Sequence, residues 1–186
     1  ATDLPLPWRD SSTVLLGPLT GELGLDWLDV FPSALVGVTP QGWMRQWNSS
    51  GRVTRRPWLE AQDVLSRVDV LVFSEEDVGG DGALIERYAR MASMAVVTHG
   101  RNGATLFYKG ASRQFPAFRA KAVDPTGAGD VFAAAFLVRL REVNDPSVAT
   151  HFANCAASFA VEGHGVSAIA TRQQVEERLR HGELYD

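Results

Sequence analysis

The sequence predicts an α/β domain in which helices cover both faces of a mainly parallel sheet. Two observations support this prediction: from Thr13 onward short apolar runs alternate with amphipathic stretches, and the links between them are short. A third is the run over residues 70–73, which is apolar at every position, as expected for a strand buried on both faces. Alternation of strands and helices with short connections is typical of α/β domains.

The first half of the chain contains strand candidates separated by helix candidates. Apolar runs predict strands over residues 13–16, 34–38, 70–73 and 94–98. Apolar residues at helical spacing predict helices over residues 23–31, 59–68 and 83–91. Between them lie an irregular aromatic segment, 40–47, and a polar turn, 48–51. Residues 1–12 contain prolines and lack periodicity, so we expect an irregular lead-in that continues from a preceding part of the protein. A domain is expected over residues 13–186.

The second half of the chain no longer alternates predicted strands with predicted helices. A hairpin is predicted over residues 104–115, with its turn at Lys109 and Gly110. Three helices follow, over residues 128–143, 147–161 and 171–179, the last with Thr171 as its N-cap. In open α/β sheets ligands bind at the carboxyl ends of the strands, so we expect the functional site there.

Composition limits the classes of function. The 186 residues include 18 Lys and Arg against 22 Asp and Glu, a net charge of −4, which argues against a general nucleic-acid binder. The longest apolar run, over residues 131–138, is too short for a membrane helix, which needs about 20 residues. The single cysteine, Cys155, excludes a disulfide framework and a cysteine-based zinc cluster. With no signal peptide in the sequence, a cytoplasmic location is expected.

The most informative segment is residues 123–130, Val-Asp-Pro-Thr-Gly-Ala-Gly-Asp. Gly127 and Gly129 allow a tight turn into the helix that follows, whose first N–H groups attract anions such as phosphates. Asp130 lies in the same turn, where a carboxylate suits the acceptance of a proton from a hydroxyl that attacks a phosphoryl group. The alternative is a glycine-rich turn in which Asp130 only complements the helix dipole.

This octapeptide, continued by residues 131–136, resembles the signature of the ribokinase-like (PfkB) carbohydrate kinases. The resemblance implies a ribokinase-like three-layer α/β/α fold, with Asp130 as catalytic base and Gly127, Ala128 and Gly129 as an anion hole. Residues 96–104 resemble the strand and Thr-x-Gly-x-x-Gly turn with which the family holds ATP. Implied nucleotide contacts are therefore Thr98, Gly100, Arg101, Gly103, Asn154, Ala157 and Gly163. Gly163, Gly165 and Ala168 also mimic a dinucleotide fingerprint, but a helix precedes them and too few residues follow for a βαβ unit.

The resemblance also implies two cation sites. Many family members place Asn-x-x-Glu where Mg²⁺ and phosphate are organised, whereas this chain has Ser74-Glu75-Glu76-Asp77. Asp77 is the implied Mg²⁺ residue, while Glu75 and Glu76 are expected at a solvated helix start. Asp124 and Thr126 resemble a monovalent-cation loop, to which Ala160, Gly163 and Gly165 would add carbonyl oxygens.

Several other residues leave alternatives open. The segments 41–45, 74–77, 116–118 and 124–126 are most similar to an inositol-kinase-like branch of the family. Gln41 and Arg45 either reach the cleft or lie in a surface loop packed by Trp43 and Trp47. Trp8 and Trp58 are expected as surface anchors. The four histidines are expected as surface or packed residues, and Cys155 as a small buried hydrophobe.

Two functions follow from the resemblance, which covers only the carboxyl-terminal part of the longer family pattern, without its N-terminal part and lid. One is an ATP- and Mg²⁺-dependent kinase for an alcohol group of a sugar, polyol, cyclitol or nucleoside, with a homodimer as the assembly to test. The other is a non-catalytic nucleotide-binding module. Intact Gly127, Gly129 and Asp130 favour the kinase, and the missing part favours the module.

Overall fold

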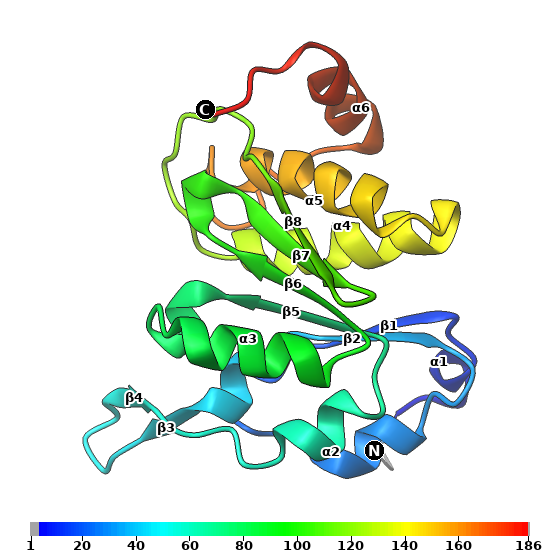
Figure 1. The fold of residues 1–186 in the computed structure, drawn as a ribbon, viewed down its shortest axis with the longest axis vertical. Coiled ribbons are helices and arrows are strands. Elements are labelled where there is room, and N and C mark those ends of the chain that lie inside the picture. Colours follow the sequence, from blue (N-terminus) through cyan, green and yellow to red (C-terminus); the bar gives the residue numbers. More distant parts are fainter. Residues whose placement is uncertain (1–3, 186) are drawn as a thin grey trace.

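The computed structural model describes residues 4–185 and contains a six-stranded sheet between two layers of helices (Figure 1). The strand order is β1-β2-β5-β6-β7-β8. The first four of these strands are parallel: β1 (Thr13–Leu16), β2 (Leu35–Val38), β5 (Val70–Ser74) and β6 (Met94–Thr98). The last two, β7 (Ala104–Tyr108) and β8 (Ala111–Phe115), form an antiparallel hairpin at one edge. The predicted mainly parallel sheet is confirmed.

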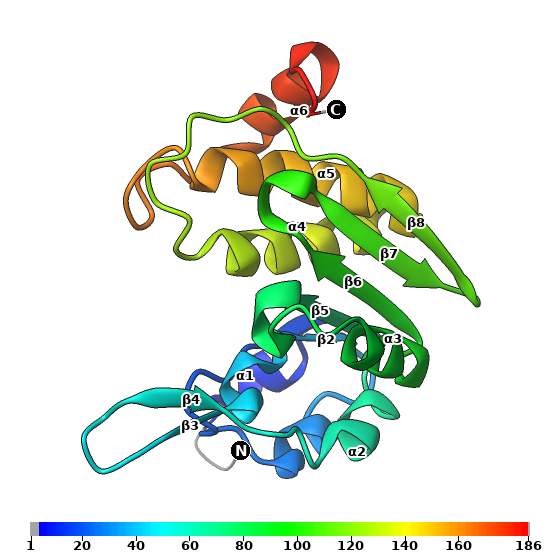
Figure 2. The same ribbon diagram turned by 60° about the vertical axis from the view of Figure 1, so that its left-hand side comes forward.

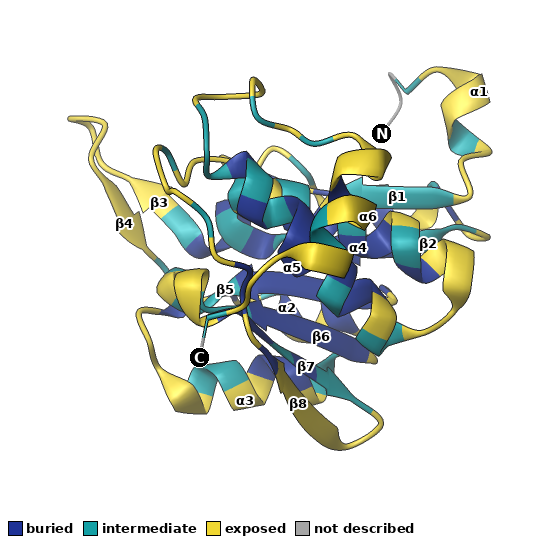
Figure 3. Ribbon diagram, turned by 90° about the horizontal axis from the view of Figure 1, so that it is seen from above, coloured by how far each residue is buried: buried dark blue, intermediate teal, exposed yellow. Residues whose placement is uncertain are grey.

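Both faces of the sheet are buried. Leu71 and Phe73 of β5 pack in a cluster with the short 3-10 helix η1 (Leu25–Asp29), α2 (Ala61–Leu65) and α3 (Gly82–Met91). Val70 and Val72 of the same strand pack on the opposite face against α4 (Ala128–Val143) and α5 (Pro146–Ala160). Figure 3 shows β5 and β6 as the buried centre. This two-sided burial explains why β5 is apolar at successive positions.

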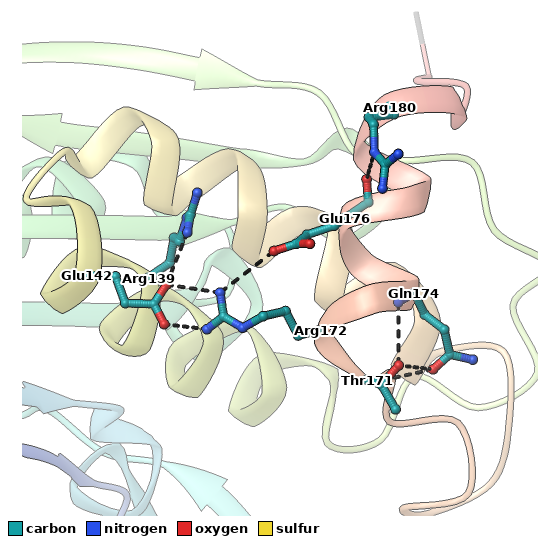
Figure 4. A network of polar contacts seen from close by, with 7 residues as sticks. All are labelled: Arg139, Glu142, Thr171, Arg172, Gln174, Glu176 and Arg180. Carbon is teal, nitrogen blue, oxygen red and sulfur yellow. Dashed lines mark hydrogen bonds and ion pairs between the residues drawn. The ribbon is translucent and has the colours of Figure 1, made fainter.

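The last helix, α6 (Arg172–His181), packs on the outer side of α5 through a third cluster around Phe152, Cys155 and Val175. Its start is a capping box: the Thr171 hydroxyl accepts from Gln174 N–H, and the Gln174 side chain accepts from Thr171 N–H. Arg172 forms an ion pair with Glu142 at the end of α4 (Figure 4). The predicted N-cap at Thr171 is confirmed.

Three predicted elements differ in extent. Instead of a helix over residues 23–31, the chain forms only the 3-10 helix η1, which begins after Gly24 and ends before Pro32. The predicted helix over residues 59–68 is shorter, α2. Within the irregular lead-in, residues Leu6–Arg9 form one turn, α1, whose prolines suit the first turn of a helix; residues 1–3 lie outside the described residues.

Residues 40–55 form a hairpin arm that the sequence pattern does not predict. The 3-10 helix η2 (Pro40–Met44) leads into β3 (Arg45–Trp47), which pairs with β4 (Val53–Arg55). The predicted polar turn is confirmed as its tip, where Asn48 Oδ1 accepts from the N–H groups of Ser50 and Arg52 at 3.0 Å. Five of the six strand residues, all but Arg45, are exposed, so no apolar alternation marks these strands.

The prediction that Trp58 is a surface anchor is wrong. Its side chain is 4% exposed, and its ring lies 5.6 Å from that of Trp43 and 5.5 Å from that of Tyr88. The ring packs between Trp43 of η2 and Tyr88 of α3. Trp8, in contrast, is exposed as predicted.

The described helices include none that combines the length and the apolar character needed to cross a bilayer.

We expect Cys155 to be unreactive toward a thiol reagent in the folded protein. The side chain is fully buried, and burial raises the pKa of the thiol to about 12. Because the unfolded thiol ionises at lower pH, this group also lowers the free energy of unfolding as pH rises from about 9 toward 12. Ellman titration at pH 8 checks this, with the exposed variant Ser112→Cys as reactive control. Equal rates for Cys155 and the introduced thiol would contradict the prediction.

Candidate functional site

The candidate site residues gather at the carboxyl end of the parallel strands. In Figure 1 the ends of β5 and β6, the beginning of α4 and the end of α5 all lie on the left-hand side of the molecule. Figure 2 shows the beginning of α4 and the end of α5 side by side from a second direction. This is the edge at which open α/β sheets bind ligands.

The beginning of α4 is uncapped and open. Gly127, at its N-cap position, has φ +81°, a left-handed conformation that favours glycine, and offers no side-chain cap. The N–H of Ala128 donates to Pro125 O (3.2 Å), but within residues 4–185 the N–H groups of Gly127, Gly129 and Asp130 have no acceptor. Gly127, Gly129 and Asp130 are exposed. Three free amide donors and one carboxylate therefore lie at the exposed beginning of this helix.

The other three long helices of the described chain differ in this respect. Asp81 caps α3, Asp145 caps α5 and Thr171 caps α6, each through its side-chain oxygen. A side-chain cap contributes about 1 kcal/mol to stability. The open start of α4 leaves donors available to an anion, which the helix dipole also favours.

The loop before α4 is fastened to the end of α5. The N–H groups of Val123 and Asp124 both donate to Val161 O, at 2.7 and 3.1 Å. Hydrogen bonds from Thr126, and a weaker contribution from His164, hold the pKa of Asp124 below its usual value. Asp124 Oδ2 lies 3.5 Å from His164 Nδ1. The structure thus brings Asp124 and Thr126 beside the turn after α5.

Thr98 is the last residue of β6, and the turn that follows includes the 3-10 helix η4 (Gly100–Asn102) and Gly103. Gly103 has φ +86°, and a Cβ there would clash with the carbonyl oxygen of Phe115. The glycine is therefore required by the packing of this turn against β8. Gly100 and Arg101, in contrast, are exposed, and nothing lies near a Cβ built on Gly100.

A histidine links this turn to the end of β5. His99 Nδ1 lies 2.7 Å from Glu75 Oε2, and its Nε2 lies 2.9 Å from Thr105 Oγ1. Glu75 begins a 3-10 helix and its side chain is 40% exposed, so the expected solvated helix start is confirmed, and its carboxylate also has a half-buried partner in His99. Glu76 is exposed, as expected. Sequence reasoning missed this bridge, since residues 75 and 99 meet only through the pairing of β5 with β6.

Asp77 completes the capping box of the 3-10 helix η3 (Glu75–Val78), whose N-cap residue is Ser74. Its Oδ2 accepts from Ser74 N–H (2.9 Å), and its Oδ1 accepts from the Gln41 side chain (3.3 Å). Gln41 thus reaches the end of β5. Of its two expected loop neighbours, Trp43 is buried and Trp47 exposed.

The donor set at Asp77 is compatible with Mg²⁺. Among the described residues no three His, Cys, Asp or Glu side chains could hold a metal ion together. Mg²⁺ in phosphate-transfer sites usually takes only one or two carboxylates, its other ligands being water and substrate phosphates. An ionised carboxylate has room for more than the two hydrogen bonds that Asp77 accepts.

The remaining predicted nucleotide residues lie in and after α5. Asn154 is 6% exposed, and its Nδ2 is 3.3 Å from both Phe115 O and Pro116 O. These contacts fix the segment after β8, and a nucleotide contact by Asn154 stays a prediction. Ala157 is half-buried, and a Cβ on Gly163 would crowd Ala168.

A family model described as pfkB family carbohydrate kinase matches residues 60–173. Among curated relatives, the chain is 40% identical over 97 residues to a ribokinase from Bacillus subtilis, covering 50% of this chain and 32% of the relative. It is 31% identical over 131 residues to a 2-dehydro-3-deoxygalactonokinase from Haloferax volcanii, covering 66% of this chain and 41% of the relative. The matched segments therefore span less than half the length of these relatives.

Solved structures with the same fold include a ribokinase from Thermotoga maritima, with a TM-score of 0.71 and 26% identity, covering 92% of this chain and 57% of the other. A nucleoside kinase from Methanocaldococcus jannaschii has a TM-score of 0.74 and 23% identity, covering 91% of this chain and 56% of the other. The three-layer fold expected from the motifs is confirmed, and the inositol-kinase-like branch stays a prediction.

We expect Gly103→Ala to lower the free energy of unfolding by about 2–4 kcal/mol, since a clash with the Phe115 carbonyl adds to left-handed strain. Gly110→Ala is the matched control: its φ is +78°, but nothing lies near its added Cβ, so strain alone should cost about 1–2 kcal/mol. Urea denaturation of both variants measures the difference. Equal losses would show that the turn does not pack against β8 as described.

Proposed function

Because this chain belongs to the pfkB family of carbohydrate kinases, we propose that it contains the nucleotide-binding part of an ATP-dependent phosphotransferase. The proposed acceptor is an alcohol group of a sugar, polyol, cyclitol or nucleoside. The observation that supports this most directly is the open start of α4, where free N–H groups lie beside the exposed carboxylate of Asp130.

The anion hole in this proposal is the turn from Gly127 to Gly129. Because Ala128 N–H already donates to Pro125 O, the donors available to a phosphoryl oxygen are those of Gly127, Gly129 and the neighbouring Asp130. Their direction along the helix axis adds the dipole of α4. In phosphoryl transfer the negative charge spreads over the oxygens of the transferred group, and donors fixed in advance stabilise it.

Asp130 is the proposed base. An ionised carboxylate repels a phosphate, so Asp130 does not serve to bind one. Its place beside the anion hole suits acceptance of the proton from the attacking hydroxyl. In a loose transition state this proton moves late, so a carboxylate is basic enough. Exposure of Asp130 leaves it accessible to an acceptor alcohol.

Mg²⁺, when bound with ATP, would neutralise charge on the phosphates. Asp77 is the residue proposed to hold it, through one carboxylate at the end of β5, oriented by Ser74 and Gln41. The proposed nucleotide contacts are Thr98, Gly100, Arg101, Gly103, Asn154, Ala157 and Gly163. A monovalent cation beside Asp124 and Thr126 is part of the same proposal, supported by the hydrogen bonds to Val161 O that hold this loop beside the end of α5.

A second candidate function is a nucleotide-binding module without catalysis. This alternative is favoured by the share of a full kinase that the chain covers, which is 57% of the Thermotoga ribokinase structure. Both functions require nucleotide binding at the same edge, but only the kinase requires Asp130.

We expect Asp130→Asn to abolish most phosphoryl transfer while nucleotide binding persists. Loss of a general base typically lowers kcat by about a hundredfold to ten-thousandfold. The natural full-length protein is assayed for ADP release with pentoses, hexoses, nucleosides and inositols, and ATP binding is followed by thermal shift. Asp145→Asn, which changes a distant cap to another good cap, is the control. Unchanged turnover in Asp130→Asn rules out the proposed base, whereas ATP binding without turnover in the wild type favours the module.

We expect Asp77→Asn to raise the Mg²⁺ concentration for half-maximal activity by about tenfold, because the carboxylate charge is lost while the cap is largely kept. Glu76→Gln is the control, since Glu76 is exposed and adjacent. Mg²⁺ titrations of turnover compare the two. Identical titration curves would remove Asp77 from the metal site.

A further inference from the structure

The hairpin arm formed by β3 and β4 is unusually basic for this chain. Residues 30–59 contain no Asp or Glu, although the whole chain has a net charge of −4. Four arginines fall within residues 45–56: Arg45, Arg52, Arg55 and Arg56. The arm projects from the body of the molecule at the same side as the carboxyl ends of β5 and β6 (Figures 1 and 2).

Two of these arginines face each other directly. Arg45 pairs with Arg55 in the antiparallel ladder. The next pair, Met44 and Arg56, is joined by a hydrogen bond from Arg56 N–H to Met44 O (2.9 Å). Hydrogen-bonded and non-bonded pairs alternate, so Arg45 and Arg55 form a non-bonded pair, the type in which side chains are closest. Like charges at directly opposed positions destabilise a hairpin.

No acidic side chain within residues 4–185 forms an ion pair with either of these two arginines. Among the described residues, neither the Arg45 nor the Arg55 guanidinium makes a hydrogen bond or ion pair, whereas the adjacent Arg56 pairs with Glu60 at 4.0 Å and donates to Trp43 O. Arg139 and Arg172 likewise share Glu142 (Figure 4). Arg45 and Arg55 therefore differ from these other arginines, whose guanidinium groups have hydrogen-bond or ion-pair partners in the fold.

The face that bears the pair is turned toward the candidate site. The Arg55 guanidinium lies against Gly79, where a side chain would collide with it, and Gly79 directly ends η3. Asp77 of η3 is in turn bound by Gln41, at the start of the arm. Trp47 and Val53, two positions along each strand, share this face and are 52% and 57% exposed. The face thus offers two guanidinium groups beside an apolar surface.

We propose that Arg45 and Arg55 bind an oxyanion group, a carboxylate or phosphate ester, on the acceptor sugar. An oxyanion between the two guanidinium groups would accept charge-assisted hydrogen bonds from both and cancel their repulsion. Trp47 would pack on the carbon skeleton of the same ligand. This inference deepens the proposed function and rests on it: it restricts the acceptor to acidic or phosphorylated sugars.

The strand order favours the acceptor over the nucleotide as the source of the oxyanion. The arm follows β2, while the predicted nucleotide turn follows β6, and β5 lies between them. Neighbouring strands are about 4.8 Å apart, so the arm and the turn start two strand spacings from each other. An acceptor group on the β2 side and a nucleotide on the β6 side would meet above β5 and the start of α4.

The experiment compares binding of ribose 5-phosphate, gluconate, neutral ribose and ATP to the natural full-length protein by calorimetry. In Arg45→Gln/Arg55→Gln we expect the affinity for ribose 5-phosphate and gluconate to fall by about tenfold or more, with ribose and ATP unaffected. The thermal midpoint should not fall, because the repulsion is removed. Arg45→Lys/Arg55→Lys keeps the charges of the hairpin and should lose part of the affinity, since lysine lacks the planar fork.

Arg52→Gln/Arg113→Gln removes two charges from exposed arginines outside the pair and should leave all four affinities unchanged. An equal loss in this control would reduce the effect to general electrostatics and overturn the inference. A loss of ATP affinity in the Arg45/Arg55 variant would assign the pair to the nucleotide and also overturn it. Absence of ribose 5-phosphate and gluconate binding in a wild-type protein that binds ATP and phosphorylates a neutral sugar would sink the inference alone. Absence of ATP binding would sink the proposed function instead.

Discussion

The uncapped start of α4 is the constraint on which the rest of the site depends. A helix must satisfy or expose its first N–H groups, and this chain caps α3, α5 and α6 with side chains while leaving α4 with a glycine. The two hydrogen bonds to Val161 O hold the preceding loop against α5, so the open turn stays at the edge of the sheet. Two-sided packing of β5 then fixes α4 relative to the strands whose ends complete the site.

Elements with strong local signals could be predicted from the sequence. The parallel strands are apolar runs, the β7–β8 hairpin has a Lys-Gly turn, and α4 begins at a glycine motif and has the bounds that the sequence predicts. The β3–β4 arm could not be predicted, because strands exposed on both sides carry no alternation. Burial of Trp58 depends on Trp43 and Tyr88, which are distant in sequence, so its flanking charges suggest the wrong environment.

The candidate site likewise combines residues that could be predicted from the sequence with contacts that could not. Its motif residues are predictable because an ordered run of threonine, glycine and aspartate of this length rarely arises by chance. Their contacts are not predictable: Gly103 is required by the carbonyl of Phe115, and Asn154 holds the backbone after β8. Residues in a ligand motif can thus also hold the fold together. Gln41 is recognisable as a residue that follows a buried strand, but its contact with Asp77 depends on the pairing of β2 with β5.

The His99 bridge has a consequence for the cost of ligand binding. Since an ionised carboxylate only accepts hydrogen bonds, the ring carries its hydrogen on Nδ1, toward Glu75, while Nε2 is held by Thr105. One imidazole therefore clamps the ends of β5 and β6 and the beginning of β7 into a single rigid rim. Preorganisation of this kind lowers the entropy lost when a ligand binds, because these segments are already joined to one another in its absence.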